Sequence, residues 1–493
     1  MKHPLLYDCT IREGEQSANT SYDLKDRLEI AELLVSLNID YIEGPWLVSE
    51  DTEGLKFYHE LNKIKNLTKT VTFIGMTSDN VKTNRRIRLA TKTNTDFCTL
   101  LTSLYLPSIH RNFSKSITDY LKKIQEHVLY LQQYFSGVFI DVEHFFDSFV
   151  TYKEFSSEFL VFMNEVVKPQ KIVLCDTRGG TKPNTIIKIT KSLLRNFCLP
   201  VGIHLHNDIA CADTTAILLS DNHMDHIQGT INGIGERVGN TNLINLIPYF
   251  IKNFNAVRYN QQKLKQVSEK IARISNIRLP LNAPYVGKTA FCHKAGLHIK
   301  QFLEIDSKAY EIFNPFDIGN KRGFLISNLS GENTKNLIYR DIQDSKLLAV
   351  LKLFEKNITT MNANIIIHDD TIIFYSKKNI FKSKKFKIIY FTIRFDKKTK
   401  LFYSKIHYDI YGTNIIVKTT SHKFILAVSK NIYYFYVKIL HKNLGIKLKY
   451  TKKWIYLFND SEKFRLSRSS DMLFSIKQLI YFFNKFHTKG SST

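Results

Sequence analysis

Two histidines stand two residues apart in the stretch GIHLHND, as His204 and His206. Residues i and i+2 of a β-strand face the same side, so both imidazoles can meet one metal ion. A carboxylate on the first predicted strand and Asn240, in GERVGN, offer oxygen ligands from other strands. Two imidazoles with carboxylate and amide oxygens suit Zn²⁺, Mn²⁺, Co²⁺ or Mg²⁺. A lone His-x-His pair is also found as a purely structural feature, so the metal site is a hypothesis.

Other polar side chains follow predicted strands in the same way. Arg12 and Glu13 come after the first predicted strand, Glu143 after the fifth and Thr177 after the sixth. Strand ends often turn polar where they meet water, which explains one or two of these groups. It does not explain an Arg, a Glu and two His on different strands. In a (β/α)8 barrel this rim is where catalysis takes place.

The elements that must position these residues alternate along the first half of the chain. Amphipathic helical patterns cover residues 23–38, 116–135 and 184–197. This alternation predicts an α/β fold of the TIM type, a (β/α)8 barrel, with a doubly wound open sheet as the alternative. The predicted strands are residues 4–11, 40–44, 70–76, 96–103, 137–145, 171–177, 201–208 and 226–233.

The predicted domain order follows from changes in pattern. Residues 1–270 form the barrel, and residues 271–345 form a small helical linker subdomain that contributes to the active site. Residues 346–485 form an α+β domain, with strands near 362–376, 386–420 and 453–458 and helices at 422–440 and 471–486. The tail, residues 486–493, is predicted to be disordered.

Charge and cysteine usage limit the class of protein. Of the formal charge of +25, residues 341–493 carry +19, with 29 Lys and Arg against 10 Asp and Glu. The excess follows a Lys-, Asn- and aromatic-rich composition, so nucleic-acid binding is only a secondary hypothesis. The six cysteines lack CxxC spacing, and no long apolar run or signal peptide is present. These features predict a cytoplasmic protein without a membrane span.

Longer motifs resemble a known superfamily. The stretch DCTIREGEQ, residues 8–16, is similar to the DxTLRDGxQ motif of the DRE-TIM metallolyases, in particular the enzymes that condense acyl-CoA with 2-oxo acids. Within them the chain looks most like the citramalate synthases of the longer type. The resemblance covers residues 3–335, and it continues weakly into a regulatory-like C-terminal domain. It rests also on YIEGPW (41–46), VEHFFDSF (142–149), LCDTRGGTKP (174–183), QGTINGIGERVGNTNL (228–243) and PYVGKTAFCHKAGLH (284–298).

The resemblance implies roles for single residues. Arg12 polarises the 2-oxo acid carbonyl, and Glu143 and Thr177 line the 2-oxo acid pocket. His298 and Tyr310 act on acetyl-CoA, and in this family they reach the active site of the partner subunit, which implies a homodimer. The implied ligands of the divalent metal are Glu13, His204, His206 and, as a weaker candidate, Asn240.

The implied reaction joins acetyl-CoA to pyruvate and hydrolyses the thioester, giving (R)-citramalate and CoA, the first step of a threonine-independent route to isoleucine. Alternatives in the same class are 2-isopropylmalate synthase, which uses 2-oxoisovalerate, and homocitrate synthase. An alternative from another class is a pseudoenzyme or basic scaffold that binds nucleic acid through residues 341–493.

Two features depart from the family pattern. Glu13 stands where the family has Asp, which displaces the carboxylate by one methylene group. Adaptation of the site to Glu predicts that Glu13→Asp keeps or raises activity and that Glu13→Gln abolishes metal-dependent turnover. Residues 346–493 also contain few glycines, notably Gly412 and Gly445, where the family's regulatory domains have Gly-rich turns. This predicts weak or absent feedback inhibition by isoleucine.

Overall fold

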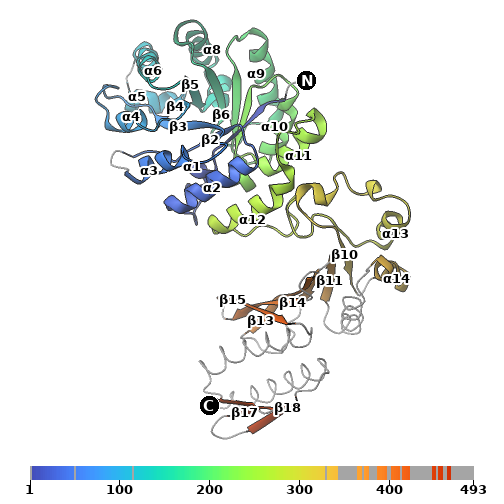
Figure 1. Ribbon diagram of the computed structural model, residues 1–493. Helices are drawn as coiled ribbons and strands as arrows, with labels where there is room; N and C mark the ends of the chain where they lie inside the picture. Colours follow the sequence, from blue (N-terminus) through green and yellow to red (C-terminus); the bar gives the residue numbers. More distant parts are fainter. Residues whose placement is uncertain are drawn as a thin grey trace, which may run out of the picture. The chain divides into compact units, whose positions relative to one another are not determined.

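The computed structural model describes residues 3–48, 52–113, 116–327, 330–341, 363–368, 371–376, 386–396, 401–410, 413–421, 447–450, 454–458 and 463–467. The chain divides into two compact units, each described by itself below (Figure 1). The first unit comprises Met1–Ala290 and Pro315–Asn320, and the second comprises Phe291–Asn314 and Lys321–Thr493. The domain boundaries expected at residues 270, 345 and 485 stay a prediction.

The first unit contains a closed barrel of eight parallel strands in chain order (Figure 1). Leu5 of the first strand lies in register with His226 of the eighth, and Tyr7 lies in register with Tyr41 of the second. This closure confirms the predicted (β/α)8 barrel and excludes the open sheet. The strands are β1 (Leu5–Asp8), β2 (Tyr41–Glu43), β3 (Lys69–Gly75), β4 (Phe97–Ser103), β5 (Gly137–Glu143), β6 (Lys171–Asp176), β7 (Val201–Leu205) and β8 (His226–Gly229).

Helices lie outside the barrel strands (Figure 1). Helix α2 (Leu24–Ser36) begins at a capping box. The Asp23 side chain accepts a hydrogen bond from the Asp26 N–H, and the Asp26 side chain accepts one from the Asp23 N–H. No helix in the described part of the chain is long and apolar enough to cross a membrane. The helices of this unit are α1 (Thr10–Gly14), α2 (Leu24–Ser36), α3 (Thr52–Leu61), α4 (Arg85–Ala90), α5 (Leu106–Asn112), α6 (Ile117–Leu131), α7 (Phe145–Thr151), α8 (Lys153–Phe162), α9 (Pro183–Asn196), α10 (Ala212–Ser220), α11 (Leu243–Phe254) and α12 (Leu264–Ile274).

Aromatic side chains fill the barrel interior. Phe97 and Phe139 stack with ring centroids 5.2 Å apart, and Tyr41 meets both rings edge-on. Tyr7 packs against Tyr41 and Phe139. This cluster is buried, so the barrel has a packed interior rather than a pore, and the rim above it rests on a rigid core.

The first strand ends earlier than predicted. The sequence pattern extended it over residues 4–11, but β1 ends at Asp8 and α1 begins at Thr10. The Asp8 carboxyl group accepts hydrogen bonds from the N–H and hydroxyl of Thr10, at 2.8 and 2.9 Å. These bonds turn the chain into a helix, so Arg12 and Glu13 lie on a buried helical turn and not on the strand.

The second unit is rich in strands, as predicted. A seven-stranded sheet has the order β15-β14-β13-β12-β11-β10-β9, and β16, β17 and β18 form a smaller antiparallel sheet. The helices predicted at 422–440 and 471–486, the tail 486–493, Gly412 and Gly445 lie outside the described residues. The elements are β9 (Cys292–His293), α13 (Gly296–Glu304), β10 (Gly323–Ile326), α14 (Glu332–Asp341), β11 (Ala363–His368), β12 (Thr371–Ser376), β13 (Phe386–Asp396), β14 (Leu401–Ile410), β15 (Thr413–Ser421), β16 (Lys447–Tyr450), β17 (Trp454–Phe458) and β18 (Lys463–Ser467).

Candidate active site

The barrel brings three predicted metal ligands together at the carboxyl ends of its strands. Candidate ligand atoms of Glu13, His204 and His206 all lie within 4.8 Å of one another, and all three residues are buried. Glu13 comes from α1, His204 from β7, and His206 from the residue just beyond β7. Residues that are about 190 positions apart in the sequence thus form one compact group of the kind that holds a metal ion.

Asn240, the weaker predicted ligand, is held next to His206 by the backbone. The two residues form an isolated antiparallel bridge, and the Asn207 N–H donates to Gly239 O at 2.9 Å. Gly239 has a φ of +94°, and a Cβ there would lie 1.8 Å from Gly233 O, so the turn requires glycine. The loop after β8 therefore delivers the Asn240 amide to the same rim.

The polar atoms of this group fit a metal ion. Glu13 Oε2, His206 Nδ1 and Asn240 Oδ1 are buried without a hydrogen-bond partner among the described residues. Buried polar atoms are nearly always paired, so several unpaired atoms in one place indicate a missing ligand. A carboxylate, two imidazoles and an amide oxygen match the donor set of a divalent cation.

The protonation states of Glu13, His204 and His206 also suit metal binding. Burial by itself raises the pKa of Glu13, but the Arg12 guanidinium and the imidazoles of His204 and His206 bring it down to about 2. Burial lowers the pKa of His204 to about 3, against the opposing charge of Glu13, and it also lowers the pKa of His206. At neutral pH the site therefore presents an ionised carboxylate and two neutral imidazoles.

Arg12 is fixed between two carboxylates. Its Nε donates to Glu43 Oε1, and its Nη1 donates to Glu13 Oε1 at 2.6 Å. The guanidinium carbon lies 3.9 Å from the centroid of the Phe73 ring. Glu43 is held in turn by the Tyr7 hydroxyl, which donates to its Oε2 at 2.6 Å. Arg12 thus has one orientation before any substrate arrives.

Sequence reasoning missed Glu43 as a site residue. Glu43 ends β2 and is completely buried, and burial raises its pKa while Arg12 lowers it. Its signal in the sequence was an acidic side chain at the end of an apolar strand, in DYIEG. The same pattern, an acidic residue at a strand end, predicted a site role for Glu143, but no role was predicted for Glu43.

Glu143 and Thr177 occupy the rim positions expected for them. Glu143 ends β5 half-buried, where burial raises its pKa and the Arg12 charge opposes that shift. Thr177 follows β6, and its hydroxyl accepts a hydrogen bond from the His144 N–H at 2.7 Å. This bond ties the ends of β5 and β6 together. The assignment of both residues to substrate binding stays a prediction.

His298 and Tyr310 lie in the second unit and contact each other. Their rings stack with centroids 4.2 Å apart and planes 25° apart. His298 is on α13 and exposed, and the Tyr310 hydroxyl donates to Gln301 of the same helix. In the same unit, the Arg322 guanidinium donates hydrogen bonds to both carboxylate oxygens of Glu311, which also pairs with His293. The pair is therefore preformed, and its action on substrate stays a prediction.

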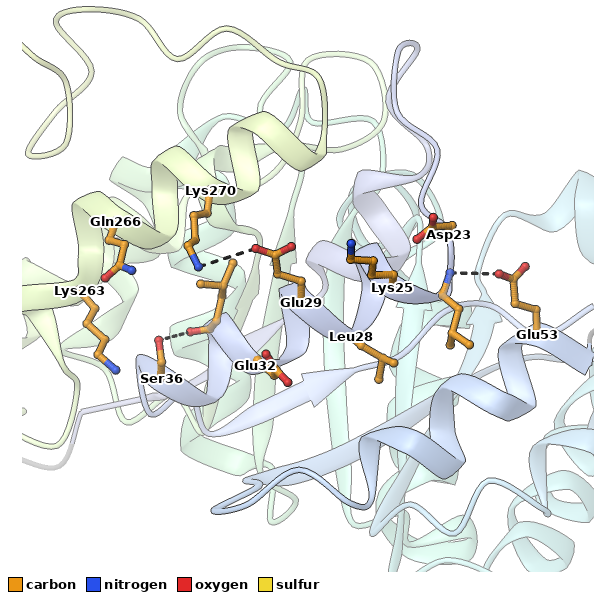
Figure 2. A pocket seen from close by; sticks show the side chains of 12 residues that line it. Asp23, Lys25, Leu28, Glu29, Glu32, Ser36, Glu53, Lys263, Gln266 and Lys270 are labelled. Atoms are coloured by element: carbon orange, nitrogen blue, oxygen red, sulfur yellow. Dashed lines mark hydrogen bonds and ion pairs between the residues drawn. The ribbon is translucent and has the colours of Figure 1, made fainter. Parts of the chain in front are cut away.

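A surface hollow of about 800 Å³ lies on the outside of the barrel between α2 and α12 (Figure 2). Lys270 pairs with Glu29 across it at 3.7 Å, and the Leu24 N–H donates to Glu53. Its lining mixes acidic and basic side chains and contains none of the predicted site residues. The hollow therefore plays no part in the site described above.

Comparison with known proteins gives two family matches along the chain. The HMGL-like family matches residues 3–271, and the homocitrate synthase post-HMGL domain-like family matches residues 285–345. The first match covers more than half of the chain. The two matched segments coincide with the barrel and with the stretch that carries His298 and Tyr310.

Individual relatives share about a third of their residues. An (R)-citramalate synthase of Aquifex aeolicus is 35% identical over 344 residues, and one of Sulfolobus acidocaldarius is 34% identical over 341. Each match covers 68% of this chain and 64% of the relative, so the chain spans less than two thirds of their length. A homocitrate synthase of Pyrococcus horikoshii is 28% identical over 332 residues, which cover 67% of this chain and 88% of that protein.

Proposed function

The chain belongs to the HMGL-like family, and from this premise we propose that it condenses acetyl-CoA with pyruvate to give (R)-citramalate and CoA. The buried group of Glu13, His204 and His206 beside Arg12 is the observation that carries this proposal. The similarity to (R)-citramalate synthases supports pyruvate as the acceptor. The reaction makes the protein an acyltransferase of branched-chain amino-acid synthesis, which we place on a route to isoleucine.

The ligand residues define one half of the chemistry. Glu13, His204 and His206, with Asn240 beside them, would hold a divalent metal ion. When bound, that ion supplies a fixed positive charge next to the carbonyl of the 2-oxo acid. Arg12 donates hydrogen bonds to the carbonyl oxygen, where negative charge develops as the new bond forms. Glu143 and Thr177 bind and orient the 2-oxo acid, so that the carbonyl carbon faces its nucleophile.

The second half is the activation of acetyl-CoA. We propose that His298 removes a proton from the thioester methyl group, since a neutral imidazole is a suitable base near pH 7. The resulting enolate carbon bonds to C2 of pyruvate, and the carbonyl oxygen gains the proton. Water then cleaves the thioester, releasing CoA and leaving a carboxylate. Tyr310, stacked on His298, keeps the ring in place. A second copy of the chain supplies this pair if the enzyme is a homodimer.

A homocitrate synthase activity, with 2-oxoglutarate as acceptor, is the second candidate. Residues 285–345 match the homocitrate synthase post-HMGL domain-like family, and the Pyrococcus horikoshii relative is covered over 88% of its length. The citramalate synthases are more similar in sequence, at 34–35% against 28% identity. This difference favours pyruvate over the longer acceptor.

One assay tests both candidates. Free CoA is measured after mixing the full chain with acetyl-CoA, a divalent metal ion and one acceptor at a time: pyruvate, 2-oxoisovalerate or 2-oxoglutarate. We expect metal-dependent release with pyruvate, abolished by a chelator. Release with another acceptor alone would replace pyruvate, and no release with any acceptor would overturn the proposal. Salt-sensitive binding of RNA or DNA in that case would favour a basic scaffold.

A further inference from the structure

A hydrogen-bonded chain runs behind His204 across the barrel interior. Its Nδ1 lies 2.8 Å from Gln228 Oε1, and Gln228 Nε2 lies 3.1 Å from Asp141 Oδ1. The exposed fractions of His204, Gln228 and Asp141 are 5%, 0% and 2%. These residues come from β7, β8 and β5, so their contacts are made inside the barrel. Neither Gln228 nor Asp141 has a role in the proposed chemistry.

The partners of Gln228 set the direction of its amide group. Its Nε2 faces a carboxyl oxygen of Asp141, and its Oε1 accepts from the Cys9 thiol at 3.9 Å. Burial, with Glu43 nearby, raises the pKa of Asp141 to about 8. In either protonation state a carboxyl group keeps an oxygen that accepts this bond. The amide oxygen of Gln228 therefore points at His204.

The direction of the amide determines where the imidazole proton lies. An amide oxygen only accepts, so the neutral ring of His204 carries its proton on Nδ1. Its Nε2 then holds the free lone pair, and this atom lies 3.8 Å from Glu13 Oε1 on the ligand side. Without the acceptor, the proton could occupy Nε2 and be drawn to the Glu13 carboxylate. A metal ion would then have to displace that proton.

We propose that Gln228, anchored by Asp141, is a positioning residue that keeps His204 in the tautomer whose Nε2 is free to bind a metal ion. The inference rests on the metal centre of the proposed function. It concerns a contact behind a ligand and not the ligand itself. Partners of this kind orient metal-binding histidines, and their loss typically costs about 10- to 100-fold in metal affinity.

The test is a titration of the full chain with Mn²⁺ alone, without substrate. We expect Gln228→Leu, which removes the acceptor at similar volume, to weaken Mn²⁺ binding by about 10- to 100-fold. Gln228→Glu keeps an acceptor oxygen and should bind Mn²⁺ close to the unsubstituted level. The matched control is Thr72→Val, which removes a buried hydroxyl bonded to Thr93 and Thr95 and far in sequence from every ligand. We expect no change in Mn²⁺ binding for this control.

A second measurement reports the tautomer directly. In ¹⁵N-histidine-labelled metal-free protein, His204 should show a protonated Nδ1, and this signal should shift in Gln228→Leu. If Gln228→Leu does not fold, Asp141→Leu is used instead, because it removes the hydrogen-bond partner of Gln228 Nε2. This variant should weaken Mn²⁺ binding to a smaller extent. Unchanged Mn²⁺ affinity in a folded Gln228→Leu or Asp141→Leu protein would overturn the inference. So would equal losses in Gln228→Leu and Gln228→Glu.

The outcome is separable from that of the proposed function. If the protein binds Mn²⁺ but releases no CoA with any acceptor, the proposed reaction fails while the positioning role is still measured. If Mn²⁺ does not bind the unsubstituted protein, the positioning role is overturned. CoA release that needs no metal would contradict the metal centre itself.

Discussion

Arg12 and Glu13 in the barrel are 7% and 3% exposed, whereas His298 in the second unit faces solvent. The barrel group has its charges fixed by buried partners, with Glu43 and Glu13 around Arg12. The pair in the second unit is held by its own ring stack, by the hydrogen bond from Tyr310 to Gln301 and by an edge-on contact between Tyr310 and His293. The difference indicates two kinds of preorganisation. The barrel rim holds buried charges in place, whereas the second unit presents an exposed imidazole whose proposed role as a base is tested by the variants that follow.

The largest expected effect comes from removing the Glu13 charge. Glu13→Gln keeps the size of the side chain but replaces an ionised ligand by a neutral amide. We expect metal-dependent CoA release to be lost. Mn²⁺ affinity should fall by more than about 100-fold, the upper end of the loss seen when a residue that supports a metal ligand is substituted. Isothermal titration with Mn²⁺ and the CoA assay check this. Full activity of Glu13→Gln would remove Glu13 from the ligand set.

The next effect separates the two regions. His298→Ala removes the proposed base, so we expect CoA release to slow by about 10²- to 10⁴-fold. Mn²⁺ binding should be unchanged, because His298 is not among the candidate ligands. Gln301→Leu, which removes the partner of Tyr310, is the matched control and should slow the reaction less. Equal activity of His298→Ala and the unsubstituted protein would exclude this residue as the base.

Shortening Glu13 tests why the barrel has Glu here. The sequence alone suggested that Glu13→Asp keeps or raises activity. The structure changes this expectation, because Glu13 Oε1 pairs with Arg12 at 2.6 Å while Oε2 stays free. Asp is one methylene shorter and cannot keep both positions, and a displacement of about 1 Å can cost about 100-fold in rate. We expect a lower kcat for Glu13→Asp. An equal or higher kcat would instead support the expectation from the sequence that the shorter side chain keeps activity.

A smaller effect concerns His226, at the start of β8, and the pH dependence of the free energy of unfolding. Burial lowers the pKa of His226 below 6.5, against the opposing charge of Asp225. The unfolded chain binds this proton below about pH 6.5 and the folded chain does not, so stability is present above that pH and falls below it. The loss is at most about 1.4 kcal/mol per pH unit for one histidine.

Urea unfolding at pH 7.5 and pH 5.5 measures this loss. Trp46 lies in the first unit, so its fluorescence in a Trp454→Phe background reports on the barrel alone. We expect His226→Gln to reduce the difference in unfolding free energy between the two pH values. An identical pH dependence in both proteins would show that His226 does not contribute to it.

The smallest expected effect is on feedback. Residues 346–493 contain few glycines. In the family that the sequence resembles, Gly-rich turns of the regulatory domain bind the feedback amino acid. We expect isoleucine at millimolar concentration to leave the initial rate of CoA release unchanged. Strong inhibition would show that the C-terminal region has kept a regulatory site.

Much of the barrel could be predicted because its signals are local. Each of the eight strands is a short apolar run, and α2 and α6 follow from helical spacing of apolar residues within one segment. The pair of His204 and His206 was found because its spacing is itself the signal. The overlong first strand was the exception, since the turn from Asp8 to Thr10 depends on side-chain hydrogen bonds that the apolar pattern does not record.

The sequence by itself determined the barrel, its polar rim and the residue types that can bind a metal ion. Only the tertiary structure decided which of them act together. Glu43 at the end of β2 contacts Arg12 on α1, which is 31 residues away in the sequence. Gln228 on β8 contacts His204 on β7, which is 24 residues away. Such contacts depend on barrel closure and register, which place side chains of different strands at one level. No local pattern of residues carries that information.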